Sequence, residues 1–123
     1  MAKGTHSYIE DNRNKTIKIF INGNFLLREE ANISVFDSGF LLGDGVWEGI
    51  RLFNGKLVFI NEHIDRLFSG AKSLAIDIGY SKEDLIKLIF DTLAVNKMSN
   101  DVHIRLIVTR GLKKTPYQHP NAN

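Results

Sequence analysis

The feature that most constrains the fold is a change in hydrophobic periodicity at Asn61. Before this residue, short apolar runs alternate with polar residues at the period of two that is typical of β-strands. After it, aliphatic residues recur at the 3.6-residue spacing of amphipathic helices. Hairpins followed by helices predict an α+β domain with a mostly antiparallel sheet, because alternating strand–helix units are absent.

Two Asn-Gly pairs predict tight turns, because both residue types tolerate a positive φ. Asn22-Gly23 and Asn54-Gly55 each separate two runs with strand character. A fifth alternating run follows the helices and ends at a glycine. The predicted strands, about five in number, are residues 16–21, 25–27, 46–53, 56–60 and 102–109.

Two helices are predicted between the fourth and fifth strands. Asn61 is a plausible N-cap for a helix that extends to about Ile76. Ser81 and Asp84 resemble a capping box, which predicts a second helix to about Lys97. Each helix has one apolar face, so both are expected to pack on one side of the sheet.

Length and composition limit the classes of function. A chain of 123 residues is one domain, in which the polar residues 1–15 form a flexible arm. A net charge of +2 does not indicate nucleic-acid binding, and no apolar run approaches the roughly 20 residues that span a bilayer. The N-terminus does not resemble a signal peptide, and cysteine is absent. We therefore expect a cytoplasmic domain without membrane partners.

Familiar cofactor and metal motifs are also missing from the sequence. The four histidines do not have metal-ligand spacing, so no metal site is expected. The glycines match neither the phosphate-binding P-loop nor the dinucleotide fingerprint. Any site for a small molecule must therefore come from other residues.

The segment from Asp37 to Arg51, DSGFLLGDGVWEGIR, is the strongest candidate for such a site. A glycine-spaced loop leads into a strand on which Trp47, Gly49 and Arg51 share one face. An aromatic wall, a gap and a fixed positive charge suit a pocket for a small anion. The alternative is an ordinary hairpin strand, with Trp47 in the core and Arg51 in solvent.

Other positive charges allow two interpretations each. Arg66 lies at the edge of the apolar face of the first helix, either solvated or as a phosphate clamp, for which guanidinium geometry is suited. His103 and Arg105 share a face of the last strand, opposite its aliphatic residues. They lie on the open side of a sheet or line a cavity; from the residues alone, the open side is expected.

These residues together resemble the small N-terminal domain of the class IV, or fold-type-IV, pyridoxal-phosphate-dependent aminotransferases. The resemblance rests on GFLLGDGVWEGIRLFNGKLVFINEHIDRL from Gly39 to Leu67 and on HIRLIVTRG from His103 to Gly111. It covers roughly residues 19–111 and is greatest for the branched-chain amino acid branch. It implies a small domain at residues 16–111 and the start of an interdomain linker at 112–123.

The resemblance also implies roles for single residues. Arg66 matches the arginine that holds the phosphate of pyridoxal 5'-phosphate. Trp47, Gly49 and Arg51 match the positions that line the substrate pocket. His103 and Arg105 match a Tyr-x-Arg pair, in which the arginine receives an acidic side chain and the tyrosine helps to hold the α-carboxylate. His103, and Leu42 at another frequent tyrosine position, depart from the pattern and leave the substrate open.

A homodimer that transfers an amino group between an L-amino acid, of branched-chain type, and 2-oxoglutarate is what the resemblance implies. D-amino-acid transamination or aminodeoxychorismate lyase chemistry is the alternative within the family, although the Arg-x-His pair of the D-amino-acid branch is replaced here by Thr115-Pro116-Tyr117. The family's Schiff-base lysine has no counterpart among the lysines present. This chain by itself, as a fragment or ordered part of a longer protein, is thus expected to be inactive, or to serve as a non-catalytic dimerisation or binding module.

Overall fold

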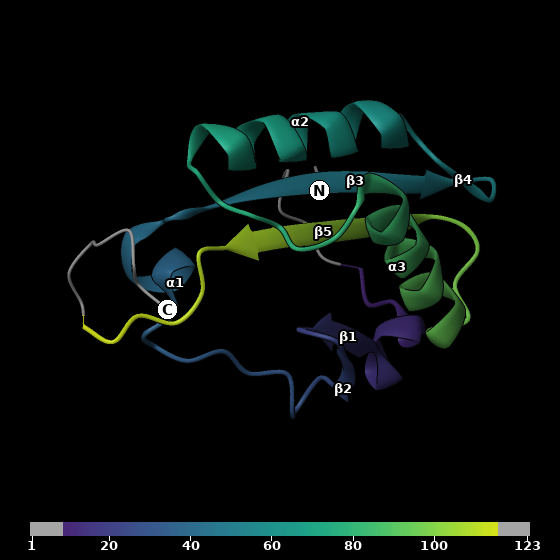
Figure 1. Cartoon of the computed structure of the whole chain (residues 1–123). Coiled ribbons are helices and arrows are strands. Elements are labelled where there is room, and N and C mark those ends of the chain that lie inside the picture. The colour runs from purple at the N-terminus through teal and green to yellow at the C-terminus, as the bar shows by residue number, and fades with distance from the viewer. Residues whose placement is uncertain (1–8, 116–123) are drawn as a thin grey trace, which may run out of the picture.

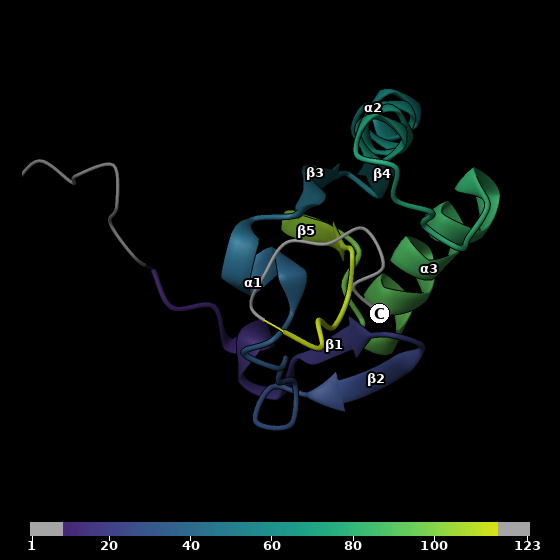
Figure 2. The same ribbon diagram turned by 60° about the vertical axis from the view of Figure 1, so that its left-hand side comes forward.

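Two antiparallel sheets and three α-helices make up the computed structural model, which describes residues 9–115 (Figures 1 and 2). One sheet is the β1–β2 hairpin, and the other has the strand order β4-β3-β5. The strands are β1 (Lys18–Ile21), β2 (Asn24–Leu27), β3 (Gly45–Phe53), β4 (Lys56–Leu57) and β5 (Val102–Thr109). The helices are α1 (Ser38–Leu42), α2 (Ile60–Ser73) and α3 (Lys82–Val95), preceded by the 3-10 helix η1 (Asn12–Thr16). The predicted arm at 1–15 and the predicted linker at 112–123 lie partly outside the described residues.

The predicted α+β class is confirmed, and so are the two turns that the sequence marked most clearly. Asn22 and Gly23 have φ values of 47° and 93°, and Asn54 and Gly55 have 50° and 75°. Both pairs therefore adopt the left-handed conformation that two-residue hairpins require. The fifth strand also has its predicted bounds, because its alternation is uninterrupted from Val102 to Thr109.

A single apolar core joins one face of β3 to α2 and α3. Ile50 and Leu52 of β3 are almost fully buried, as are Ile64 and Leu67 of α2. Leu85, Ile89 and Leu93 of α3 complete this core, and partly buried aliphatic residues of β5 pack against it. The helices thus cover one face of the three-stranded sheet, and the opposite face carries none of these core residues.

The structure differs from the sequence-based prediction between β4 and α2. The predicted strand at 56–60 has only two residues, because Phe59 takes a left-handed conformation with φ of 53° and ends the extended backbone. The helix then begins at Ile60, so Asn61 is inside its first turn and is not the N-cap. It ends at Ser73, just before Ala75 with its φ of 55°. The N-cap at Ser81 is confirmed, since its hydroxyl accepts the Asp84 N–H at 3.0 Å.

The glycine-spaced loop contains a helix that the sequence did not reveal. The Asp37 carboxylate accepts the Gly39 N–H at 2.8 Å and caps α1, which ends at Gly43 with a φ of 65°. Five residues are too few to show helical periodicity, so only these end signals were visible in the sequence. The strands also divide between two sheets, because β1 and β2 pair only with each other.

Arg110 joins the ends of three elements of the fold. Its Nε and Nη2 donate to the two carboxylate oxygens of Asp44 at 2.6 and 3.2 Å. Nη2 also donates to the Leu74 carbonyl, just after α2, at 2.6 Å. The end of β5, the start of β3 and the end of α2 are therefore held together. No helix among the described residues is long and apolar enough to cross a membrane.

Candidate functional site

The face of the sheet opposite the helices carries five of the six site residues that the sequence predicted. Antiparallel pairing of β3 with β5 sets Gly49 opposite Arg105 and Arg51 opposite His103. Trp47 lies on the same face with 59% of its surface exposed, so it does not enter the core. His103 and Arg105 lie on the exposed side of β5, as expected from its alternation. We call this group, Trp47, Gly49, Arg51, His103 and Arg105, the open-face cluster.

Contacts within the open-face cluster run diagonally between the two strands. The Arg105 guanidinium lies over the Trp47 ring, 4.1 Å from its centroid, which is a cation–π arrangement. The His103 ring lies over Gly49, where an added Cβ would be 3.1 Å from the imidazole Cε1. The absence of a side chain at Gly49 thus leaves the space beside which His103 packs.

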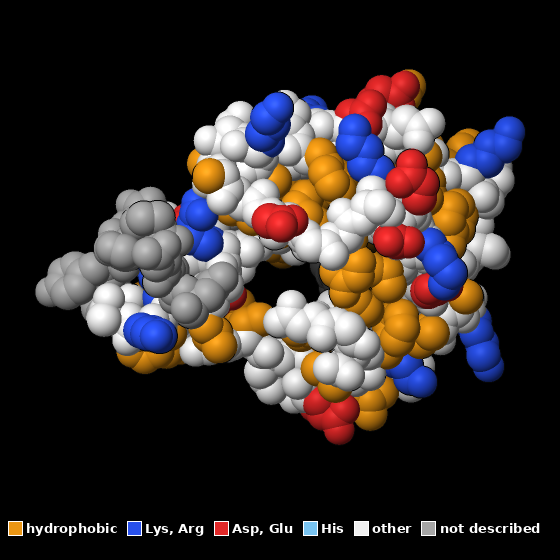
Figure 3. Space-filling view, viewed as in Figure 1, with side chains coloured by type: hydrophobic (Ala, Val, Ile, Leu, Met, Phe, Trp, Pro, Cys, Tyr) orange, Lys and Arg blue, Asp and Glu red, His pale blue; other side chains and the backbone are white. Residues whose placement is uncertain are grey.

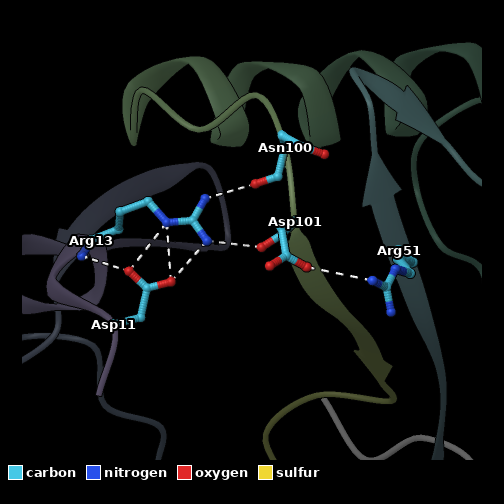
Figure 4. A network of polar contacts seen from close by, with 5 residues as sticks. All are labelled: Asp11, Arg13, Arg51, Asn100 and Asp101. Carbon is cyan, nitrogen blue, oxygen red and sulfur yellow. Dashed lines mark hydrogen bonds and ion pairs between the residues drawn. The ribbon is translucent and has the colours of Figure 1, made fainter. Parts of the chain in front are cut away.

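Arg51 is linked to the N-terminal segment through the turn that precedes β5. Its Nη2 donates to the Asp101 carboxylate at 3.4 Å, and both side chains are largely exposed. Arg13, in η1, donates to the carbonyls of Asn100 and Asp101 at 2.7 and 2.8 Å while its own carboxylate partner is Asp11 (Figure 4). Asp101 therefore lies between two arginines and connects the predicted arm to the open-face cluster.

Arg66, the sixth predicted residue, lies on the helix side of the sheet. Its Nε donates to Glu48 Oε1 at 2.6 Å and its Nη2 to Glu48 Oε2 at 2.7 Å. The Glu48 side chain is 4% exposed, whereas the Arg66 side chain is 74% exposed. The guanidinium thus remains open to solvent although its partner is buried.

The neighbourhood of Glu48 strongly favours its ionised form. Hydrogen bonds from Arg66 lower the pKa of Glu48 from 4.5 to about 2, against the opposing effect of burial, and His63 adds a further lowering contact. His63 Nδ1 is 2.7 Å from Glu48 Oε2. An ionised carboxylate only accepts hydrogen bonds, so Nδ1 carries the proton in this contact.

The open-face cluster and the pair of Arg66 and Glu48 meet along one edge of β3. This strand pairs with β5 from Gly45 to Leu52, but β4 covers its other edge only at Leu52 and Phe53. Within residues 9–115, no strand covers the edge from Gly45 to Ile50. A small molecule at this edge can contact both faces. The space-filling view also shows an opening between the layer of α2, β3 and β5 and the β1–β2 hairpin, with hydrophobic side chains beside it (Figure 3).

The chemistry of the donors fits an anion with several oxygens. Arginine has five N–H donors, and Glu48 takes two of those on Arg66, which leaves three for a ligand. A guanidinium that presents parallel N–H groups suits a phosphate or a carboxylate. A metal ion is a poorer fit, because the described part of the chain has no group of three or more His, Cys, Asp or Glu side chains arranged to hold one.

Reasoning from the sequence missed Glu48 and His63. Glu48 occupies the inward parity of β3, between the aliphatic residues Val46 and Ile50. An acidic residue at a position that the alternation assigns to the core must have a partner, and this was the available signal. Its partners lie 15 and 18 residues later, at His63 and Arg66 on one helical face.

Comparisons with known proteins all find the same group of enzymes. A family model described as amino-transferase class IV matches residues 45–123. The branched-chain-amino-acid aminotransferase-like protein 1 of Arabidopsis thaliana is 44% identical over 110 residues, which are 89% of this chain and 20% of that protein. A D-alanine aminotransferase of Staphylococcus haemolyticus is 38% identical over 103 residues, 84% of this chain and 36% of that one.

Solved structures give the same result. A branched-chain amino acid aminotransferase from the organism abbreviated T.th., with pyridoxamine 5'-phosphate, matches with a TM-score of 0.75 and 28% identity, over 88% of this chain and 36% of that one. The chain described here thus spans between a fifth and just over a third of the length of these three proteins.

Proposed function

The chain belongs to the class IV aminotransferase family, and on that basis we propose that it is the small-domain portion of a pyridoxal-phosphate-dependent enzyme. The parent enzyme would transfer an amino group between an L-amino acid, of branched-chain type, and 2-oxoglutarate. The observation that carries this proposal is the Arg66 guanidinium, which is fixed by a buried carboxylate but still exposes three N–H donors. Such a group suits the phosphate of pyridoxal 5'-phosphate.

Arg66 is the residue of this chain that would hold the cofactor. A solved relative is described with pyridoxamine 5'-phosphate, which supports a cofactor of this type. When bound, the cofactor supplies an electron sink for the carbon that loses or gains the amino group. The contribution of Arg66 is to retain the phosphate and to orient the ring relative to the edge of β3.

The open-face cluster would bind the substrate. Trp47 offers an apolar wall for a branched side chain, and Gly49 leaves room next to it. Arg51 and Arg105 place two positive charges on the same face, which suits the two carboxylates of glutamate and 2-oxoglutarate. His103 lies between them and would contact the α-carboxylate.

A D-amino-acid substrate is the second candidate, because D-alanine aminotransferases are also among the relatives. The branched-chain type is favoured by the sequence Trp47-Glu48-Gly49-Ile50-Arg51 and by the 44% identity to the branched-chain-aminotransferase-like protein of Arabidopsis thaliana. The residues Thr115-Pro116-Tyr117 replace the Arg-x-His pair expected for D-amino acids. Aminodeoxychorismate lyase chemistry is a further alternative within the family.

The proposal includes the organisation of the parent protein. Residues 1–15 would be an arm, residues 16–111 the small domain and residues 112–123 the start of a linker to a domain with the catalytic lysine. The parent would be a cytoplasmic homodimer. The 123-residue chain alone would be inactive, because transamination needs a lysine that none of its own lysines matches. Borohydride reduction of this chain with pyridoxal 5'-phosphate, followed by mass spectrometry, should give no stoichiometric adduct.

Assays of the full-length protein separate the candidate substrates. We expect activity with leucine and 2-oxoglutarate that exceeds activity with D-alanine or aminodeoxychorismate. Activity with D-alanine alone would overturn the assignment of the substrate. Replacing Arg66 with Ala should weaken retention of the cofactor by about 1.5–3 kcal/mol, the usual worth of a charge-assisted hydrogen bond. Unchanged retention would remove Arg66 from the cofactor site.

A further inference from the structure

Glu48 is the one acidic residue in the inward-facing row of β3. Its neighbours in this row, Val46, Ile50 and Leu52, are aliphatic and pack toward the helices. Glu48 itself is 3% exposed, so its charge is almost entirely removed from water. A buried ion pair rarely stabilises a fold more than well-packed apolar residues of similar size. Stability alone thus gives a weak reason for a carboxylate at this position.

The contacts of Glu48 suggest a second reason. Both of its oxygens hold the same guanidinium, through Arg66 Nε at 2.6 Å and Nη2 at 2.7 Å. Two parallel hydrogen bonds fix the plane of a guanidinium as well as its position. A long side chain that is 74% exposed would otherwise sample many rotamers and lose that freedom only on binding a ligand.

The same carboxylate also orients His63, one helical turn before Arg66. Glu48 Oε2 accepts the hydrogen bond from His63 Nδ1 at 2.7 Å. This contact fixes the proton on Nδ1, and Nε2 is then the ring nitrogen that remains for other contacts. Glu48 therefore determines the orientation of two side chains of α2 from a position on β3.

From this geometry we infer that Glu48 is a positioning residue for the phosphate site: it holds Arg66 so that three N–H donors face the incoming anion, and it fixes the ring of His63 beside them. This inference rests on the proposed function, because it takes the phosphate of pyridoxal 5'-phosphate as the anion. Glu48 does not touch the cofactor. It acts through Arg66, whose conformational freedom it removes before binding.

A charge-matched pair of variants separates this role from a general electrostatic one. Glu48→Gln removes the carboxylate that holds Arg66 and keeps the shape of the side chain. Asp65→Asn removes a carboxylate at the residue before Arg66, where Asp65 is exposed and pairs with Lys82 at 2.9 Å. Both variants change the net charge by the same amount, but only the first removes a contact of Arg66.

The experiment titrates the apo form of the full-length protein with pyridoxal 5'-phosphate and follows protein fluorescence. The set of proteins is the wild type, Glu48→Gln, Asp65→Asn, Arg66→Ala and the double variant of Glu48→Gln with Arg66→Ala. We expect Glu48→Gln to weaken binding about 10-fold to 100-fold, the range that loss of an orienting partner costs at metal sites. Asp65→Asn should bind as the wild type does. In the Arg66→Ala background, Glu48→Gln should cause no further loss.

A spectroscopic measurement on the 123-residue chain gives a second readout that does not depend on the cofactor. In ¹⁵N NMR spectra, the Arg66 Nε–H signal should be shifted and slow to exchange in the wild type and in Asp65→Asn. In Glu48→Gln it should move toward the signals of solvated arginines. If Glu48→Gln fails to fold, Arg66→Lys serves instead, since lysine keeps the charge without the planar fork and should bind the cofactor about 10-fold more weakly or worse.

The outcomes distinguish this inference from the proposed function. If the wild-type full-length protein does not bind pyridoxal 5'-phosphate, the proposed function is wrong and this inference falls with it. If the wild type binds and Arg66→Ala does not, but Glu48→Gln binds as tightly as the wild type, the proposed function stands and the positioning role is overturned. Additive losses in the double variant would also overturn it, because they show that Glu48 acts independently of Arg66.

Discussion

The two faces of β3 each present an arginine paired with a carboxylate, but the pairs differ in burial. On the helix side, Glu48 is 4% exposed and holds Arg66 with two hydrogen bonds of 2.6 and 2.7 Å. On the open face, Asp101 is 78% exposed and contacts Arg51 once, at 3.4 Å. Water competes freely for the second pair and very little for the first. The comparison teaches that burial of the carboxylate, rather than the presence of an ion pair, decides whether the arginine is held in place.

This contrast fits different tasks for the two arginines. A cofactor phosphate is recognised in one geometry, so a fixed guanidinium is an advantage. Substrates that alternate in a transaminase differ in their side chains, and a loosely held arginine can adapt to more than one of them. The comparison predicts that the two pairs respond differently to mutation, to pH and to added bulk.

The largest expected effect is on stability. Arg66→Ala leaves the Glu48 carboxylate buried with His63 as its remaining partner and should destabilise the chain by about 2–3 kcal/mol, somewhat below the cost of breaking a fully buried pair. Arg51→Ala should cost about 1 kcal/mol or less, because the pair that it breaks is exposed. Urea unfolding of the two variants measures both values. Equal losses would show that burial of Glu48 does not distinguish the pairs.

A smaller effect is expected from pH. The pKa of Glu48 is about 2 in the folded chain, against an ordinary value of 4.5, because of its hydrogen bonds with Arg66. A carboxyl whose pKa is depressed by folding stabilises the fold above its unfolded pKa and loses this contribution as the pH falls through its folded pKa. The melting temperature should therefore fall between pH 4.5 and about 2 more steeply in the wild type than in Glu48→Gln. Parallel curves for the two proteins would contradict this assignment.

The smallest effect concerns added bulk on the open face. A Cβ at Gly49 would approach the exposed His103 ring to 3.1 Å, and this ring can move aside. Gly49→Ala should thus change the free energy of unfolding by about 0.5 kcal/mol or less, the usual range for an exposed site. Gly45→Ala is the matched control on the same strand, because its Cβ would lie 2.6 Å from the backbone oxygen of Val108. The control should be clearly less stable, and a comparable loss in Gly49→Ala would show that the open face is rigidly packed.

Local pattern and chain chemistry determined much of this protein. Alternation and Asn-Gly pairs predicted the strands, 3.6-residue spacing predicted both long helices, and the segment from Gly39 to Leu67 indicated the family. The shared face of Trp47, Gly49 and Arg51 also follows from the sequence, because a strand alternates its side chains regardless of what surrounds it. These features depend on neighbours within a few residues.

Only the tertiary structure decided which side chains meet. The register of β3 with β5 sets His103 opposite Arg51, and the packing of α2 on the sheet brings Arg66 to Glu48 across 18 residues of sequence. Sequence periodicity assigns a residue to a face, but it does not fix the register between strands or the position of a helix along them. Those are set by the complementary shapes of the packed side chains in the core. For this reason Glu48 read as a misplaced acid in the sequence and became, in the fold, the partner that holds Arg66.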